Sequence, residues 1–104
     1  SGLLEPEERE IIEGHAQVRN IFSIGRRRRI AGCQVTEGLL RRNSPVRVIR
    51  DGVVIFTGSI SSLKRFKDDA REVNTGFECG VALEGFADFE LEDTLEGFRI
   101  ELST

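Results

Sequence analysis

The dipeptide Asp51-Gly52 constrains this chain most, because it stands between two runs rich in β-branched residues, 46–50 and 53–57. An Asp-Gly pair in that setting predicts a two-residue hairpin with a turn of the primed class, since both residues tolerate the positive φ angles that such turns require. Pro45 cannot donate to a strand ladder, so it fits the start of the first arm. The chain therefore contains at least one antiparallel strand pair.

Other short apolar or alternating runs recur at intervals of about 8 to 12 residues, separated by turn residues. No stretch has a convincing helical period. We predict a turn at 36–38, a bend at Gly58 and an acidic loop over 85–93. The predicted strands cover residues 11–22, 30–35, 46–50, 53–57, 59–63, 77–83 and 94–102. This pattern predicts an all-β fold, a small antiparallel barrel or sandwich, and favours the closed barrel because closure removes edge strands.

The length of 104 residues fits one domain. Residues 1–10 have no apolar period and are expected to be a linker or a cloning remnant, which leaves 11–104 as the domain. No run approaches the roughly 18 apolar residues of a membrane span, so we expect a cytoplasmic monomer without membrane contact. Two cysteines are too few for a disulfide framework and are expected to be free thiols.

Charge is distributed unevenly although the net charge is only −3. Residues 1–18 have one cation against five carboxylates, residues 19–71 have thirteen against four, and residues 72–104 have one against nine. A basic middle can present a local positive field to a polyanion if the fold keeps its cations on one face. The alternative is that the acidic C-terminal third neutralises the basic middle.

The basic middle has two local concentrations of cations. In 63–69, Leu-Lys-Arg-Phe-Lys-Asp-Asp, three cations surround Phe66, which suits a nucleic-acid end because a ring stacks on a base while cations hold phosphates. The other interpretation places Phe66 under the loop beside the core and leaves the cations as a solvated rim. Four arginines at 26–29 have to face solvent or phosphates, as the tip of a hairpin or as a contact to RNA.

The sequence offers little for catalysis. It contains no P-loop spacing, no nucleophile elbow and no cluster of metal ligands, and His15 is its single histidine. A cysteine paired in space with His15 is the one catalytic arrangement that the residues permit, and a buried structural cysteine is the commoner outcome. We therefore expect no enzyme activity, no metal and no cofactor.

Six motifs resemble, in order and spacing, the C-terminal domain of bacterial translation initiation factor 2. The similarity extends from about residue 11 to residue 100. The last two motifs, together with the two cysteines, are specific to that family. The motifs are Ile30–Cys33, Val35–Gly38, Val48–Asp51, Ser62–Asp69, Glu72-Val73 and Gly76–Gly80.

The resemblance implies a β-barrel like the second domain of elongation factor Tu. It also implies that this barrel binds the acceptor end and formylmethionyl group of initiator tRNA, and that it reaches the ribosome through the full-length factor. The family's GTPase domain lies elsewhere in its sequence. Carried onto matching positions, the resemblance nominates Lys64, Arg65, Phe66, Lys67, Cys33, Glu78, Cys79 and Gly80 as site residues. The family commonly has Tyr where Phe66 stands, so a hydroxyl hydrogen bond is lost while stacking remains available. Its relatives often have a less charged turn at 26–29, so Arg26 is added as a phosphate contact.

The binding mechanism expected from this resemblance has two parts. The cations of 64–67 neutralise phosphates, which gives salt-sensitive affinity with little selectivity. A small pocket near Cys33 and Cys79 rejects an unformylated, charged amine, and Gly80 lets backbone N–H groups approach the formyl oxygen. The competing hypothesis is a protein-docking β-barrel that uses Phe86 and Phe89 without touching tRNA.

Overall fold

The computed structural model describes residues 7–24, 28–65 and 68–103. Every regular element in these ranges is a strand. The strands are β1 (Glu7–Ile24), β2 (Arg28–Arg41), β3 (Pro45–Arg50), β4 (Val53–Arg65), β5 (Asp68–Asp69), β6 (Glu72–Asn74), β7 (Glu78–Leu83) and β8 (Thr94–Ser103). Within the described ranges there is no helix long and apolar enough to cross a membrane.

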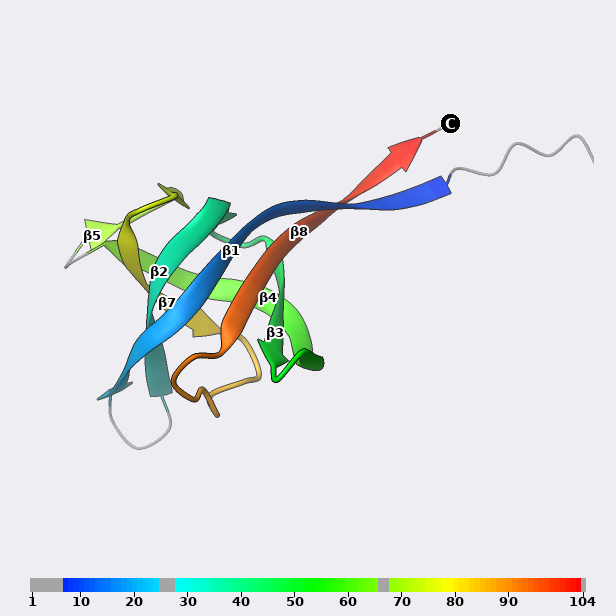
Figure 1. Ribbon diagram of the computed structural model, residues 1–104. Helices are drawn as coiled ribbons and strands as arrows, with labels where there is room; N and C mark the ends of the chain where they lie inside the picture. Colours follow the sequence, from blue (N-terminus) through cyan, green and yellow to red (C-terminus); the bar gives the residue numbers. More distant parts are fainter. Residues whose placement is uncertain (1–6, 25–27, 66–67, 104) are drawn as a thin grey trace, which may run out of the picture.

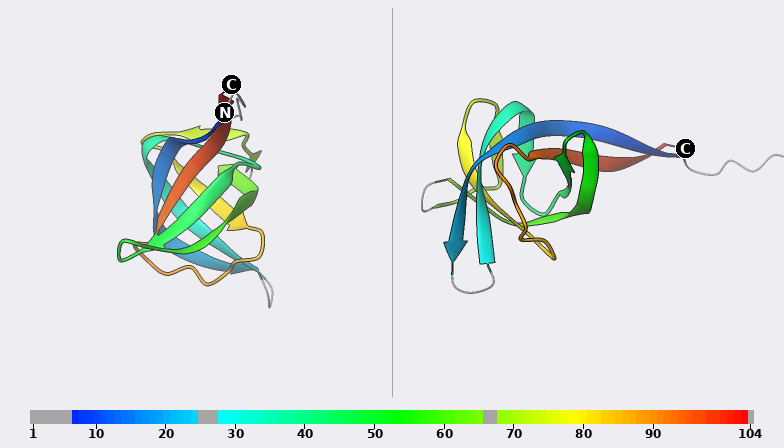
Figure 2. Two further views of the ribbon diagram at one scale, coloured as in Figure 1. Left: turned by 90° about the vertical axis from the view of Figure 1, so that its right-hand side faces the viewer. Right: turned by 60° about the horizontal axis from the view of Figure 1, so that its bottom comes forward.

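The strands form a closed ring in the order β1-β8-β3-β4-β7-β2, because β1 also pairs with β2. All of these pairings are antiparallel. The short strands lie beside the ring, β6 on β2 and β5 on β4. Figure 2 shows the strands winding around a common interior. The predicted all-β antiparallel fold that closes on itself is confirmed.

Strands β1 and β8 continue past the ring as a two-stranded ribbon (Figure 1). The ladder in this ribbon extends from Ile12 opposite Phe98 to Glu7 opposite Ser103. Strand β1 therefore begins inside the stretch that the sequence assigned to a linker. Residues 7–10 are all charged and their side chains are all exposed. The sequence there therefore has no apolar alternation that would predict a strand.

The core fills the ring, and several strands alternate between buried and more exposed side chains, the pattern expected of strands with one wet face. In β7, for example, Cys79, Val81 and Leu83 are buried and the residues between them are not. The buried apolar residues are Ala16, Val18, Ala31, Cys33, Val35, Leu40, Val46, Val48, Ile60, Leu63, Val73, Cys79, Val81, Leu83, Phe89, Leu95 and Phe98.

The predicted hairpin is confirmed. Asp51 and Gly52 have φ angles of 53° and 78°, both positive as a type I′ turn requires. Arg50 pairs with Val53 across the turn, and Pro45 is the first residue of β3.

Two predicted interruptions are absent. Gly58 lies inside the continuous strand β4, and residues 36–38 lie inside β2. Gly38 has a positive φ of 59° and is the ladder partner of Gly14, and the register with β1 shifts just beyond this pair, between His15 and Ala16. A Cβ on Gly38 would collide with the carbonyl oxygen of Glu13, and one on Gly14 with that of Leu39. These glycines therefore mark a close approach of two strands rather than a turn.

The region before β7 also differs from the prediction. Phe77 was expected on the core face of a strand with Cys79, but it precedes β7 and is 47% exposed. The chain reverses at Thr75-Gly76, where the N–H of Phe77 donates to the carbonyl of Asn74, so the alternation begins only after it. The stretch before that turn forms β6, whose central Val73 is buried against the core.

Candidate nucleic-acid interface

The floor of the candidate site is a pair of glycines on neighbouring strands. Gly32 of β2 lies opposite Gly80 of β7, and Gly80 also lies opposite Lys64 of β4. A Cβ at Gly32 would lie 3.0 Å from the Phe22 ring, and one at Gly80 would lie 3.1 Å from the Ile30 side chain. The two glycines thus leave a hollow that side chains at either position would start to fill.

Around this floor is a pocket of about 570 Å³. It joins β1, β2, β4 and the turn that leads into β7. The lining residues are Arg19, Asn20, Phe22, Ile30, Gly32, Cys33, Gln34, Lys64, Arg65, Gly76, Phe77, Glu78, Cys79 and Gly80. Six of the nine residues predicted from the sequence are among them: Lys64, Arg65, Cys33, Glu78, Cys79 and Gly80. The other three, Arg26, Phe66 and Lys67, lie outside the described residues.

Cations and aromatic rings lie together on this pocket. Arg65 is half-buried, with its guanidinium carbon 4.4 Å from the centre of the Phe77 ring, a cation–π contact. Lys64, its neighbour on β4, is exposed. Phe22 of β1 also lines the pocket, and it is 55% exposed. The pocket therefore combines positive charge with apolar surface open to solvent.

The two cysteines of the lining face the core. Cys33 is 1% exposed and Cys79 is 5% exposed, and both belong to the buried apolar cluster. Burial raises the pKa of the Cys33 thiol well above its ordinary value, and it raises the pKa of Cys79 to about 11 against the opposing charge of Arg65. Both cysteines are consequently neutral thiols near pH 7.

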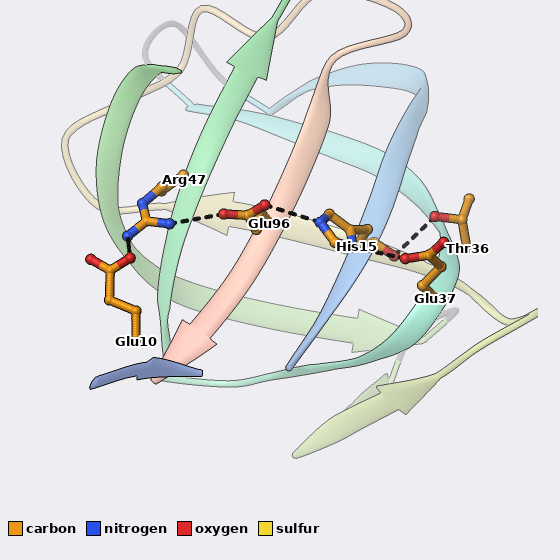
Figure 3. A network of polar contacts seen from close by, with 6 residues as sticks. All are labelled: Glu10, His15, Thr36, Glu37, Arg47 and Glu96. Carbon is orange, nitrogen blue, oxygen red and sulfur yellow. Dashed lines mark hydrogen bonds and ion pairs between the residues drawn. The ribbon is translucent and has the colours of Figure 1, made fainter. Parts of the chain in front are cut away.

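His15 is engaged in a separate network on the face formed by β1, β8 and β3 (Figure 3). Its Nδ1 lies 3.2 Å from a carboxylate oxygen of Glu37, and its Nε2 lies 3.0 Å from one of Glu96. Arg47 donates from Nη1 to the other Glu96 oxygen at 2.9 Å and also pairs with Glu10. His15 is thus committed to two glutamates rather than to either cysteine, and the predicted rim position fits its 28% exposed side chain.

The electrostatics of this network favour the charged form of Glu96. Burial acts to raise the pKa of Glu96, but hydrogen bonds from His15 and Arg47 outweigh it, and the pKa is lowered. In the part of the chain that the structure describes, no group of three or more His, Cys, Asp or Glu side chains is arranged to hold a metal ion. The contacts of this network join β1, β2, β3 and β8, so it acts as a clamp between strands.

A second clamp holds the acidic loop against the ring. The guanidinium of Arg50 donates to both carboxylate oxygens of Asp93, at 2.9 and 2.8 Å, and to the carbonyl of Asp88 at 2.8 Å. Together with Arg47 and Glu96, this pair means that part of the basic middle is neutralised by the acidic C-terminal third. Neutralisation does not extend to Lys64 or Arg19, for which the described residues provide no ion pair.

The aromatic residues of the acidic loop do not form the docking surface that the competing hypothesis needs. Phe89 is 2% exposed and belongs to the core. Phe86 is partly buried, stacks on Phe56 with ring centres 4.9 Å apart, and meets Phe89 edge-on at 5.3 Å. The three rings form an extension of the core beneath the loop.

Sequence reasoning missed the side of the pocket contributed by β1. Asn20 pairs with Gly32 and Phe22 with Ile30, which places both residues over the glycine floor. A signal for them existed, because strands predicted at 11–22 and 30–35 around a short turn imply that the end of the first lies beside the start of the second. Arg19, by contrast, carries no local signal that distinguishes it from the other cations.

Comparison with known proteins gives clear relatives, although no protein-family model matches the chain. The chain is 57% identical over 101 residues to translation initiation factor IF-2 of Moorella thermoacetica, which covers 97% of this chain and 11% of that protein. Identity to the IF-2 of Enterococcus faecalis is 54% over 100 residues, 96% of this chain and 12% of that protein. Identity to the IF-2 of Clostridium tetani is 52% over 100 residues, 96% and 15% respectively. The chain thus spans less than a sixth of the length of these relatives.

Proposed function

Because the chain belongs to the translation initiation factor IF-2 family, we propose that it binds the acceptor end of initiator tRNA together with the formylmethionyl group attached to it. The similarity covers nearly all of this chain and a small part of each relative, which supports a domain-sized module of a translation initiation factor. The pocket carries the proposal, because it gathers six residues nominated by the sequence resemblance from β2, β4 and β7 into one cavity.

The cations of the pocket supply the affinity for phosphates. Lys64 and Arg19 are exposed, and Arg65 is held beside Phe77. An exposed Lys or Arg that neutralises a phosphate releases condensed counterions, so affinity falls as salt rises. These contacts fix the position of the RNA end and carry no information about the amino acid.

The aromatic rings provide a surface for the terminal base. Phe22 and Phe77 are 55% and 47% exposed, so each offers part of a ring face to a ligand in the pocket. Stacking of a base on an exposed aromatic ring contributes roughly 1 to 3 kcal/mol and tolerates any base. Phe22 and Phe77 could thus also take the base-stacking role that the sequence predicted for Phe66.

Selection for the formyl group follows from desolvation. A methionyl ester without the formyl group has a charged α-ammonium, which loses hydration on entering a pocket whose lining includes Phe22, Ile30 and three glycines. A formylated amine is neutral and can accept hydrogen bonds at its oxygen. Of the described lining residues, Glu78 alone is a carboxylate, and it is exposed, where salt and water screen its attraction for a cation.

A titration tests the proposal directly. The ¹⁵N-labelled chain is titrated with formylmethionyl initiator tRNA and with the same tRNA lacking the formyl group, while backbone amide shifts are recorded. We expect shifts at 32–34, 64–65 and 76–80, weaker binding of the unformylated tRNA, and roughly ten-fold loss of affinity between low and moderate salt. Equal affinity for both tRNAs, or shifts confined to 84–93, would contradict the proposal.

The module's role in the whole factor is a binding role. It presents initiator tRNA, the ribosome is reached through the remainder of the factor, and the chemistry of GTP belongs to another part of the polypeptide. Docking through Phe86 and Phe89 receives no support, since Phe89 is buried and Phe86 packs between two other rings.

A further inference from the structure

Two cysteines far apart in the sequence lie directly opposite each other in the ring. Cys33 of β2 is the ladder partner of Cys79 of β7. Both are free thiols, and both side chains face the core. Opposite residues of an antiparallel pair have Cα atoms roughly 4.5 to 5.5 Å apart, inside the range of about 4.4 to 6.8 Å that disulfides span. The fold therefore places the two thiols where a bond between them needs no rearrangement of the strand order.

We propose that Cys33 and Cys79 form a reversible cross-strand disulfide in exchange with a low-molecular-weight disulfide such as oxidised glutathione. The thiolate of Cys79 attacks one sulfur of the small disulfide, which yields a mixed disulfide and releases one small thiolate. The thiolate of Cys33 then attacks the Cys79 sulfur and releases the second small thiolate. Two protein thiols are oxidised, one small disulfide is reduced to two thiols, and the protons of the cysteines pass to the released thiolates.

The pocket lies next to these thiols. Both cysteines are among the residues that line the cavity of about 570 Å³, although their side chains face the core. Cys79 is the entry point because it is the less buried of the two and lies near the charge of Arg65, which opposes the rise in its pKa. Cys33 is more deeply buried and donates weakly to the carbonyl of Ala31 at 3.5 Å. It is placed to act second, as the resolving thiol.

The geometry also makes the bond easy to reduce. Cβ atoms of opposite residues lie roughly 4.5 to 5.5 Å apart, whereas a relaxed disulfide needs about 3.5 to 4.5 Å. At Cβ separations above about 4.5 Å the strands have to draw together to form the bond, and such strain favours reduction. Gly32 and Gly80 are the adjacent ladder pair, so the floor of the pocket shifts with them. The redox site does not depend on the proposed RNA binding.

The test uses the 104-residue chain in mixtures of oxidised and reduced glutathione. Samples are quenched in acid, denatured, alkylated with iodoacetamide and weighed by intact mass spectrometry, with an amide spectrum to verify the fold before quenching. We expect both alkylation sites to disappear together, with a mass lower by two hydrogens, and to return in excess reduced glutathione. Two alkylatable thiols in the folded chain under oxidising conditions, a dominant stable glutathione adduct, or bond formation only in denaturant would each overturn the inference.

Two variants test the order of attack. Cys33→Ser is expected to stop at the glutathione adduct on Cys79. Cys79→Ser is expected to take up glutathione at least ten-fold more slowly, because the remaining thiol is deeply buried and mostly protonated. Equal uptake by the two variants would overturn the assignment of Cys79 as entry thiol. If a variant fails to fold, peptide mapping of the wild-type adduct trapped at short times identifies the first cysteine to react.

Discussion

The pocket and the network around His15 use the same kinds of charged residue in opposite ways. In the network, Arg47 and His15 both bind the carboxylate of Glu96, so these charged groups hold β1, β3 and β8 together. At the pocket, Lys64 and Arg19 are exposed beside apolar surface, with no ion pair to them among the described residues. The difference indicates which cations stabilise the fold and which remain available to an anionic ligand.

The largest expected effect comes from filling the floor of the pocket. Gly80→Leu should weaken binding of formylmethionyl tRNA on the order of 100-fold, because the new side chain occupies the hollow. The fold should survive, since the nearest side-chain atom, on Ile30, can move away from a Cβ at 3.1 Å. Fluorescence anisotropy and thermal unfolding measure the two effects.

Ala82→Leu is the matched control for this variant. Ala82 is two residues further along the same face of β7 and does not line the pocket. If both leucine variants lose binding equally, the pocket is not the binding site and the contrast between the two regions fails.

The second clamp, between Arg50 and Asp93, uses its charges as the His15 network does, and Asp93 is the position that tests it. Burial acts to raise its pKa, but the hydrogen bonds from Arg50 and from the N–H of Glu90 outweigh it and lower the pKa. A carboxyl with a lowered pKa in the fold stabilises it above its ordinary pKa, and that stability is lost as pH falls through the folded pKa. Asp93→Asn should therefore lower the Tm by roughly 5 °C at pH 7 and flatten the dependence of Tm on pH below about 4.

Calorimetry from neutral to acidic pH measures this change, with tRNA binding at pH 7 as the second readout. Binding by the folded variant should be unchanged, because Asp93 does not line the pocket. A steep loss of binding in a folded Asp93→Asn chain would mean that the pocket and the Arg50–Asp93 clamp are coupled.

The aromatic wall of the pocket should contribute an intermediate effect. Phe22→Leu removes a half-exposed ring and should weaken binding about ten-fold, within the roughly 1 to 3 kcal/mol that stacking contributes. Phe22→Tyr keeps the ring and should bind like the wild type. Equal losses in both variants, measured by anisotropy, would show that the ring face is not what the ligand uses.

The smallest effect is expected from a single cation. Lys64→Gln should reduce affinity several-fold and lower the slope of log affinity against log salt by about one, the signature of one lost phosphate contact. Arg42→Gln removes an exposed cation that does not line the pocket and should leave the slope unchanged. A slope that responds equally to both substitutions would indicate diffuse attraction rather than a defined contact.

Local chemistry explains what the sequence predicted well. The turn at Asp51-Gly52 depends on two residues and their φ angles, and the alternation in β7 after Phe77 depends on one strand. Both can be inferred without knowing any partner. The resemblance to a known family nominated Lys64, Arg65 and Gly80 as site residues, and the structure places all three on one pocket.

The errors arose where a residue's role is decided by a distant strand. Gly38 has the positive φ of a turn glycine, yet it lies inside β2, at a close approach to β1 that only its pairing with Gly14 reveals. Residues 7–10 have no apolar period and become a strand through β8, about ninety residues away in the chain. Arg19 lines the pocket at a shift in the register of β1 with β2, between Val18 and Asn20. Periodicity within one segment contains none of this information.

The close approach of Gly14 and Gly38 has a consequence for any attempt to evolve this module. Neither residue lines the pocket, yet even one methyl group at either position would meet a carbonyl oxygen of the neighbouring strand. In a randomised library sorted for a new ligand, both positions should return glycine from every round. The residues that line the pocket can therefore vary only while Gly14 and Gly38 remain glycine.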